Sequence, residues 1–187
     1  RILEIIISII GLTIGLALIP FVLIGNAIAN KGGLFYTQAR IGRNGKVFKI
    51  LKFRTMGKNA ETNGAVFATI NDARITPFGK FLRKTRIDEF PQFYNILKNE
   101  MGVIGPRPER PVFVSEIAKR MPFYETRHVI KPGLTGWAQV NYSYGETIED
   151  SLIKLQYDLY YIKHRSIFLD INIVLKTFST VLFYRGQ

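Results

Sequence analysis

The chain has 187 residues, of which 26 are Lys or Arg and 14 are Asp or Glu, so its formal net charge is +12. A basic excess of this size indicates an anionic partner, such as a phosphate compound, a nucleic acid or an anionic membrane surface. Because the chain has no cysteine, disulfides, thiolate zinc sites and a cysteine nucleophile are excluded. Its two histidines, His128 and His164, lack the spacing of a metal site, so the chemistry must come mainly from carboxylates.

An apolar segment without charge runs from Ile5 to Ala29. As a straight helix it would be about 37 Å long, enough to cross a hydrocarbon core of about 30 Å. One transmembrane span is therefore the plain interpretation. Pro20 and the basic residues at both flanks favour an alternative, in which a re-entrant membrane helix kinks at Pro20 and leaves on the side where it entered.

The next segment, Leu34 to Thr55, has the pattern of a β-hairpin. Two strand-like runs flank Arg43-Asn44-Gly45, and Asn-Gly is the strongest short-range hairpin signal. Residues 57–71 are polar and rich in Gly and Asn, which predicts a loop.

Two short helices are expected to follow. Thr76-Pro77 is typical of an N-cap followed by proline in the first turn, and the pattern predicts a helix that ends near Thr85. A second helix is expected to begin with Asp88 as its N-cap, and its apolar stripe comprises Phe90, Phe93, Tyr94 and Leu97. Prolines exclude regular helix from residues 105–111.

The C-terminal part reads as mostly helical. We predict a helix over residues 112–128 that breaks at Met121-Pro122, a loop over 131–140, and a helix over 146–164. The last predicted helix, 168–184, has one apolar stripe that comprises Ile171, Val174, Leu175, Phe178, Val181 and Leu182. Packing into the core is the default for such a stripe, and a helix lying in the membrane surface is the alternative.

The strongest candidate for chemistry is the adjacent pair Asp88-Glu89. A helix N-terminus attracts phosphate, and two neighbouring carboxylates can share a divalent cation such as Mg²⁺. A carboxylate can also accept a phosphoryl group as a nucleophile. The plainer interpretation is an N-cap with a first-turn acidic neighbour. Arg107 lies between two prolines, which stiffen the backbone that carries its guanidinium. Such an arginine suits a phosphate site. The plainer interpretation is an arginine on a rigid surface loop.

Four motifs resemble the bacterial sugar transferases, the monotopic polyprenol-phosphate phosphoglycosyl transferases. They are "YTQARIGRNGKVFKILKFRTM", "ITPFGKFLRKTRIDEFPQFYNILKNEMGVIGPRPE", "KPGLTGWAQVN" and "LQYDLYYIKHRSIFLDINIVLKT". They occur in the family's order and cover nearly the whole chain. The resemblance favours the larger exopolysaccharide-type members, of which this chain would be the catalytic core. Family members often have Ser before the membrane proline, where this chain has Ile19.

The resemblance implies an α/β fold, rich in α-helix with a small β-hairpin or sheet. Residues 1–31 would be the re-entrant membrane helix and 32–187 the catalytic domain, with interfacial amphipathic helices, on the cytoplasmic face of the bacterial inner membrane. The implied reaction transfers a sugar-1-phosphate from a UDP-sugar, favoured as a UDP-hexose, to undecaprenyl phosphate. UMP is released, and the product would initiate exopolysaccharide or O-antigen assembly.

The same resemblance assigns roles to residues. Asp88 would attack the β-phosphate and carry a covalent phosphosugar, and Glu89, with Asp88, would hold Mg²⁺. Arg83 and Arg107 match phosphate-contacting arginines, and the hairpin adds Lys52 and Arg54 as further candidates. Asp158 lies in a family motif, but its role cannot be assigned from the sequence.

Two other classes of protein were weighed against an enzyme. A membrane-anchored nucleic-acid-binding module would explain the basic charge, but the chain has no RNA-binding or helix-turn-helix motif and its basic residues are spread over many segments. We therefore expect no nucleic-acid partner. A non-catalytic membrane scaffold is disfavoured because the candidate catalytic residues are intact. A homodimer that pairs the Trp137 loop or the last helix remains an open alternative.

Overall fold

The computed structural model describes residues 1–29, 33–58, 60–61, 64, 72–142 and 147–182. Most of the loop predicted over 57–71 lies outside these residues. So do the boundary predicted at residue 31, the start of the helix predicted at 146, the end predicted at 184, and the side chains of positions 181 and 182.

The chain is mostly helical with two small two-stranded sheets, which confirms the α-rich character predicted from the sequence. In order, the elements are α1 (Ile2–Ala29), β1 (Phe35–Ile41), η1 (Arg43–Gly45), β2 (Val47–Phe53), α2 (Pro77–Lys84), η2 (Ile87–Glu89), α3 (Gln92–Leu97), β3 (Gly102–Ile104), α4 (Pro111–Arg120), η3 (Tyr124–Val129), β4 (Gly133–Thr135), α5 (Trp137–Asn141), α6 (Ile148–His164) and α7 (Ile167–Leu182), where η marks a 3-10 helix.

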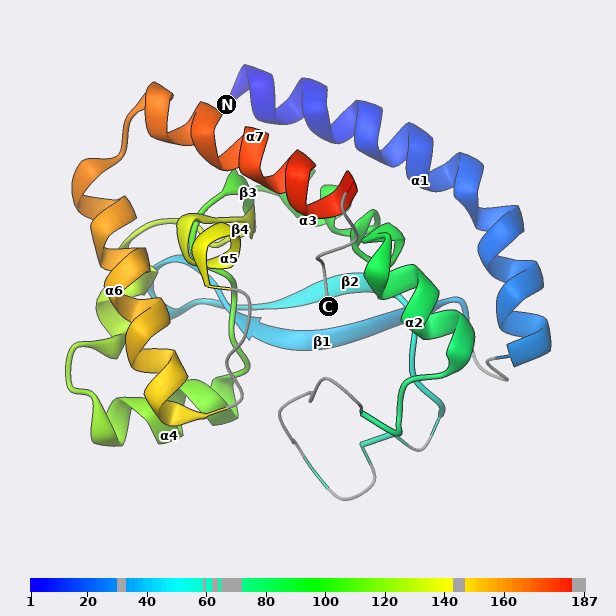
Figure 1. Ribbon diagram of the computed structural model, residues 1–187, viewed down its shortest axis with the longest axis horizontal. Coiled ribbons are helices and arrows are strands. Elements are labelled where there is room, and N and C mark those ends of the chain that lie inside the picture. The colour runs from blue at the N-terminus through cyan, green and yellow to red at the C-terminus, as the bar shows by residue number, and fades with distance from the viewer. Residues whose placement is uncertain (30–32, 59, 62–63, 65–71, 143–146, 183–187) are drawn as a thin grey trace.

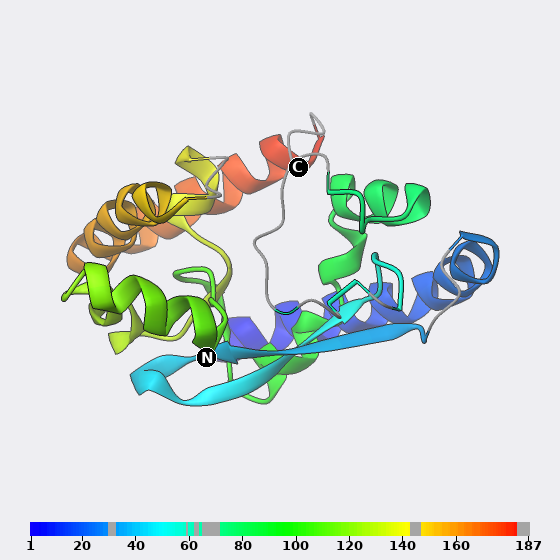
Figure 2. The same ribbon diagram turned by 90° about the horizontal axis from the view of Figure 1, so that it is seen from below.

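The hairpin runs through the middle of the molecule (Figure 1). In the view from below, α4, α5 and α6 lie over one end of the hairpin, and α2 and the C-terminal part of α1 lie over the other (Figure 2). The strands β1 and β2 are antiparallel, with Phe35 opposite Phe53 and Ile41 opposite Val47, as predicted. Asn44 and Gly45 both have positive φ, of 55° and 75°, so the turn uses the conformation that an Asn-Gly pair tolerates best.

Helix α1 is one continuous helix that includes Pro20 and changes direction in its C-terminal part (Figure 1). One face packs on the rest of the chain through small residues, because a Cβ at Gly11 would overlap the Phe93 ring and one at Gly25 would overlap the Phe78 ring. The other face exposes large apolar side chains, among them Ile10 at 56% and Leu16 at 65%. Among the described residues, α1 alone is a helix long and apolar enough to cross a membrane.

Helix α2 begins as the sequence predicts, since the Thr76 hydroxyl accepts a hydrogen bond from the Gly79 N–H at 3.0 Å and Pro77 occupies the first turn. The absence of a side chain at Gly79 lets the helix approach the end of β2, because a Cβ there would overlap the Thr55 carbonyl. The hydroxyl of the same Thr55 accepts a hydrogen bond from Arg83 Nε at 3.0 Å.

The predicted start of the next helix is wrong in detail. Asp88 makes no N-cap: it lies inside the 3-10 turn η2, which Arg86 precedes in the left-handed conformation with φ 58°, and α3 begins only at Gln92. The predicted stripe is also rotated, because Tyr94 is 50% exposed while Asn95 and Ile96 are buried. The Asn95 amide explains this burial, since it donates to the Lys49 carbonyl and accepts from the Leu51 N–H across β2.

Residues 131–140 are more ordered than a turn-rich loop. They contain β4, which pairs in parallel with β3, and the first four residues of α5. Residues 105–110 contain no helix, as predicted, but Pro111, which the prediction also excluded, begins α4, where a first-turn proline needs no N–H. The break at Met121-Pro122 separates α4 from η3. A capping box at Thr147 and Asp150 starts α6.

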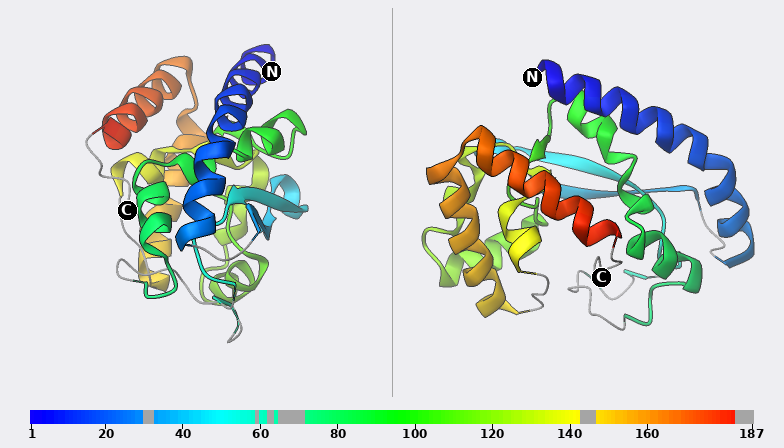
Figure 3. Two further views of the ribbon diagram at one scale, coloured as in Figure 1. Left: turned by 90° about the vertical axis from the view of Figure 1, so that its right-hand side faces the viewer. Right: turned by 45° about the horizontal axis from the view of Figure 1, so that its top comes forward.

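The default expectation for the last helix is wrong. The apolar stripe of α7 does not enter the core: Ile171, Leu175 and Phe178 are 52%, 64% and 63% exposed, and Ile173, outside the stripe, is the buried one among the described side chains of this helix. Helices α1 and α7 lie along one edge of the molecule, on the same side of the hairpin (Figure 3). The apolar surface of α7 is therefore exposed on the same side of the hairpin as α1.

Candidate active site

One cavity of about 270 Å³ lies between β1, β2, α2, η2 and the segment that precedes α4. It is strongly basic, with nine Lys or Arg side chains and four Asp or Glu side chains in its wall. The basic members are Arg40, Lys52, Arg54, Lys58, Arg74, Arg83, Arg86, Arg107 and Arg110, and the acidic ones are Glu61, Asp88, Glu89 and Glu109. All six residues predicted as site residues, Lys52, Arg54, Arg83, Asp88, Glu89 and Arg107, thus line the same cavity.

Glu89 is the anion around which the cations gather. Its Oε1 lies 2.9 Å from Lys52 Nζ, 3.0 Å from Arg107 and 3.6 Å from Arg86. Burial alone would raise the pKa of Glu89, but the charges of Lys52, Arg107 and Arg86 outweigh burial and hold the pKa well below its usual value. Glu89 is therefore ionised at neutral pH although it is 7% exposed.

Asp88 is in the opposite situation to its neighbour. It is 5% exposed, and its buried Oδ1 has no hydrogen-bond partner among the described residues. Burial raises the pKa of Asp88 to about 6, against the lowering effect of Lys52 and with a further raising effect of ionised Glu89. At neutral pH Asp88 is thus a poorly solvated carboxylate with a free lone pair, which is what a nucleophile needs.

The other predicted cations differ in how firmly they are held. Burial lowers the pKa of Lys52, and Glu89 offsets part of this effect. Arg83 is fixed by Thr55 at the cavity wall. Arg54 donates instead to the backbone carbonyls of Gly33 and Phe35, and its guanidinium lies over the Tyr36 ring, so it reaches the cavity from the rim.

The carboxylate pair fits a magnesium ion that takes its other ligands from phosphate and water. Lys52, Arg86 and Arg107 all contact Glu89 through Oε1, which leaves Oε2 for the ion. Asp88 Oδ1 has no hydrogen-bond partner among the described residues and is the second oxygen that can bind the ion. Protein sites for Mg²⁺ commonly use one or two carboxylates and complete the octahedron with substrate phosphates. No cluster of three or more metal-ligating side chains occurs among the described residues.

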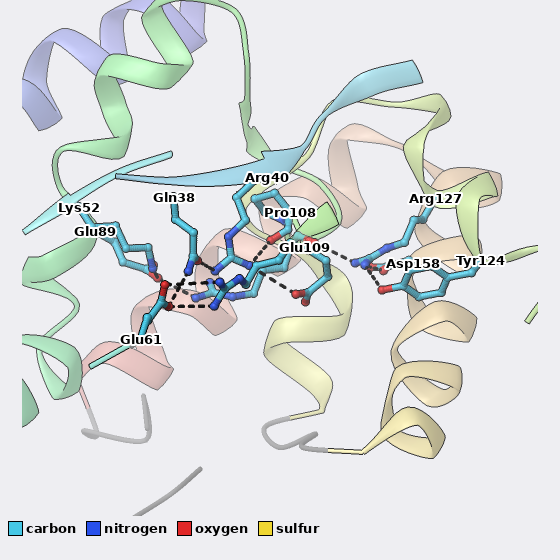
Figure 4. Close-up of polar contacts among 12 residues, drawn as sticks. Gln38, Arg40, Lys52, Glu61, Glu89, Pro108, Glu109, Tyr124, Arg127 and Asp158 are labelled. Carbon is cyan, nitrogen blue, oxygen red and sulfur yellow. Dashed lines mark hydrogen bonds and ion pairs between the residues drawn. The ribbon is translucent and has the colours of Figure 1, made fainter. Parts of the chain in front are cut away.

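Asp158, whose role the sequence left open, belongs to a buried network behind the cavity (Figure 4). Its carboxylate lies 2.7 Å from Arg127, and that guanidinium also donates to the Arg107 carbonyl at 3.0 Å and to the Tyr124 hydroxyl at 2.7 Å. Arg107 in turn contacts Glu89. Asp158 therefore acts on the site through Arg127 and Arg107.

Sequence reasoning missed the other end of the cavity. Gln38 and Arg40 share one face of β1 by the period of two, and Arg110 directly precedes α4. Gln38 and Arg40 stand within a quoted family motif and Arg110 directly follows another, but only the packing of β1 against the segment before α4 brings them together with Glu61.

Comparison with known proteins identifies the family of the chain. The family model described as bacterial sugar transferase matches residues 1–184. The chain belongs to this family, and the resemblance inferred from the four motifs is confirmed.

Individual relatives differ in the sugar that their names print. The chain is 46% identical over 155 residues to the UDP-N-acetylgalactosamine-undecaprenyl-phosphate N-acetylgalactosaminephosphotransferase of Aeromonas hydrophila. The aligned region covers 83% of the chain and 37% of that protein. It is 42% identical over 162 residues to the UDP-glucose:undecaprenyl-phosphate glucose-1-phosphate transferase of Xanthomonas campestris pv. campestris, covering 85% and 34%. It is 39% identical over 197 residues to the galactosyl transferase CpsE of Streptococcus agalactiae serotype III (strain NEM316), covering 100% and 42%. The chain thus spans well under half the length of these relatives.

Proposed function

We propose that this chain is the catalytic core of a phosphoglycosyl transferase that moves a sugar-1-phosphate from a UDP-sugar to undecaprenyl phosphate. The observation that carries the proposal is Asp88, a buried carboxylate with an unpartnered oxygen, inside a basic cavity of a sugar transferase family member. Two of the relatives named above support the donor and acceptor classes, because their names print a UDP-sugar and undecaprenyl phosphate.

The reaction proceeds in two displacements at the β-phosphorus. In the first, an Asp88 oxygen forms a bond to phosphorus, the bond to the oxygen that bridges the two phosphates breaks, and UMP leaves with that electron pair. In the second, a phosphate oxygen of undecaprenyl phosphate attacks the same phosphorus and the bond to Asp88 breaks. The product is undecaprenyl diphosphate-sugar, and the carboxylate is restored.

The surrounding cations stabilise the charge that builds up in each displacement. Lys52, Arg86 and Arg107 are already drawn together by Glu89, so they need little rearrangement when a diphosphate enters. Arg83 is held in the wall by Thr55 and adds a further positive charge near Asp88. When bound to Glu89 and Asp88, Mg²⁺ would supply charge neutralisation of the diphosphate.

The position of the basic residues favours a small phosphate substrate over a nucleic acid. Nine of the chain's 26 basic side chains converge on one cavity, together with four carboxylates. A nucleic-acid surface would instead present its cations on an open face that follows a backbone.

We also propose that the protein works at the cytoplasmic face of the bacterial inner membrane, with α1 re-entrant. Support comes from the outward apolar faces of α1 and α7 on one edge of the molecule and from Pro20 inside α1. The chain has no cysteine, so Arg1→Cys and Gly33→Cys give single labelling sites. An impermeant thiol reagent applied to inside-out vesicles should label both, and labelling of one alone would contradict the re-entrant helix.

The reaction is tested by UMP release from the purified chain with UDP-glucose, UDP-galactose or UDP-N-acetylhexosamines, plus undecaprenyl phosphate and Mg²⁺. We expect release with one donor, loss with EDTA, and loss in Asp88→Ala. The matched control is Glu116→Gln, which removes an exposed carboxylate from α4. Release that persists in Asp88→Ala would overturn the covalent step, whereas no release with any donor would count against the activity of this core.

A covalent intermediate can also be sought directly. With a UDP-sugar but no acceptor, the wild-type chain should gain the mass of one phosphosugar, and Asp88→Ala should gain none. An unmodified wild-type chain that still releases UMP would point to direct transfer.

A further inference from the structure

The cavity is also lined by a second group of polar side chains, among them Gln38, Arg40 and Glu61 (Figure 4). At its centre is the carboxylate of Glu61, which accepts hydrogen bonds from Arg110 and Gln38 and is also hydrogen-bonded to the Tyr36 hydroxyl. Arg110 donates through both terminal nitrogens, at 2.8 and 3.4 Å, and the Gln38 amide donates at 3.0 Å. Three donors from β1 and the start of α4 thus converge on one pair of oxygens.

These donors are held in place by groups other than Glu61. The guanidinium of Arg110 lies 5.5 Å from the centre of the Phe113 ring, which fixes it by a cation–π contact. The Gln38 amide is oriented by Arg40, which donates to Gln38 Oε1 at 2.6 Å, so that the amide nitrogen faces Glu61. Arg40 itself donates to the Pro108 carbonyl at 2.9 Å. The donors therefore keep their arrangement if Glu61 leaves.

Glu61 is the least secured member of the group. Its side chain is 34% exposed, against 16% for Arg110. The ion pair is only partly buried, so water weakens it, and a phosphate group, which carries more charge than a carboxylate, can displace Glu61. A planar guanidinium fork beside an amide suits a phosphate as well as a carboxylate.

We propose that Arg110 and Gln38 form a second oxyanion subsite, which binds a phosphate group of a substrate and which Glu61 occupies in the free protein. The inference rests on the proposed function, because that reaction brings two phosphate compounds to one cavity. The phosphate belongs either to the nucleotide or to the polyprenol lipid, and in both cases Glu61 competes with it.

The experiment uses the full chain in detergent with Arg110→Gln, Glu61→Gln and the double variant. Arg120→Gln, at the exposed end of the same helix, is the matched control. Binding of UMP is measured by calorimetry, and the KM values for UDP-sugar and undecaprenyl phosphate are measured separately. Because UMP binding needs no turnover, this readout stands even if the assignment of Asp88 fails.

We expect Arg110→Gln to weaken one phosphate ligand by about tenfold to a hundredfold, the range for losing charged hydrogen bonds, with kcat little changed. Glu61→Gln should strengthen the same ligand by about twofold to fivefold. A change in UMP binding assigns the subsite to the nucleotide, and a change only in the KM for undecaprenyl phosphate assigns it to the lipid.

The double variant separates competition from general electrostatics. If Glu61 acts by occupying the subsite, its replacement should have no effect once Arg110 is gone. An undiminished effect of Glu61→Gln in the Arg110→Gln background would overturn the proposal. So would an Arg110→Gln chain that binds both ligands like Arg120→Gln, or one that loses kcat alone.

Discussion

Asp158 on α6 and Arg127 on η3 form an ion pair that is closed to solvent, with side chains 1% and 4% exposed and 2.7 Å between their charged atoms. The pair holds the backbone of Arg107, whose side chain meets Glu89. Asp158 is not among the residues that line the cavity, so we expect it to act by fixing the position of Arg107 through Arg127. A buried pair of this kind contributes more to a defined geometry than to net stability.

Arg127→Lys tests this positioning role. Lysine can keep the charge beside Asp158, but it cannot also hold both the Arg107 carbonyl and the Tyr124 hydroxyl with a planar fork. We expect kcat for UMP release to fall about tenfold or more with a smaller change in KM, a split that separates misplacement from weaker substrate binding.

Two further variants are compared with Arg127→Lys. Tyr124→Phe removes only the contact at Arg127 NH1 and should leave kcat within about threefold, since one hydrogen bond contributes about 1 kcal/mol. Asp158→Asn leaves Arg127 buried without its counter-ion, and we expect a loss of about 3–5 kcal/mol, read as a lower Tm. An Arg127→Lys chain with wild-type kcat at equal Tm would contradict the positioning role.

The rate of UMP release should fall as the pH is lowered through about 6, because the pKa of Asp88 is raised to about 6 and the protonated acid is not a nucleophile. Lys52 is the cation that most lowers this pKa, so Lys52→Met should move the acidic limb to higher pH. Lys49→Met, on the exposed face of the same strand, is the control and should not move it. A pH–rate profile of kcat/KM measures both, and superimposable limbs in all three proteins would refute the assignment.

Asp88→Asn should stabilise the fold at alkaline pH. Burial raises the pKa of Asp88 from 3.8 in the unfolded chain to about 6, so the folded state favours the protonated acid. Its contribution to stability is complete below about pH 4 and is lost as the pH rises through about 6. Because asparagine resembles the protonated acid, we expect a gain of about 3 kcal/mol at pH 8 and little gain at pH 4. Thermal unfolding at the two pH values measures this, and an equal Tm shift at both would exclude the mechanism.

The outward face of α7 should contact lipid. Phe178→Cys with a polarity-sensitive fluorophore should show a blue shift in lipid nanodiscs and quenching by brominated lipid. Val112→Cys on α4 is the control, since Val112 is 58% exposed and α4 lies on the opposite side of the hairpin from α1 and α7 (Figure 1). Equal quenching of the two labels by a water-soluble quencher would show that α7 does not rest on the membrane.

The sequence predicted the elements whose signals are local. Asn44-Gly45 specifies the hairpin turn and Thr76-Pro77 the start of α2, because these residues fix backbone angles and caps by themselves. The six site residues were found through motifs, and the cavity contains all of them.

What the sequence could not predict depends on contacts between distant segments. Arg86 takes a positive φ that is rare without glycine, and this moves Asp88 from an expected cap into a 3-10 turn. The periodicity of α7 identifies an apolar face, but not whether that face meets the core or the outside. Likewise, the pairing of Arg127 with Asp158 joins two helices that no local pattern connects.

The packing of α1 has a consequence for anyone who wants a water-soluble form of this enzyme core. Phe90 directly follows Glu89, and its Cβ lies where it would touch a side chain added at Gly15 of α1. Phe93, one turn later, fills the space beside Gly11. Deleting α1 would uncover both rings and remove the surface against which the turn with the two carboxylates is braced. Solubility is therefore better sought by placing polar residues on the outer face of α1 than by truncation, because the inner face of this helix supports the turn that carries Asp88 and Glu89.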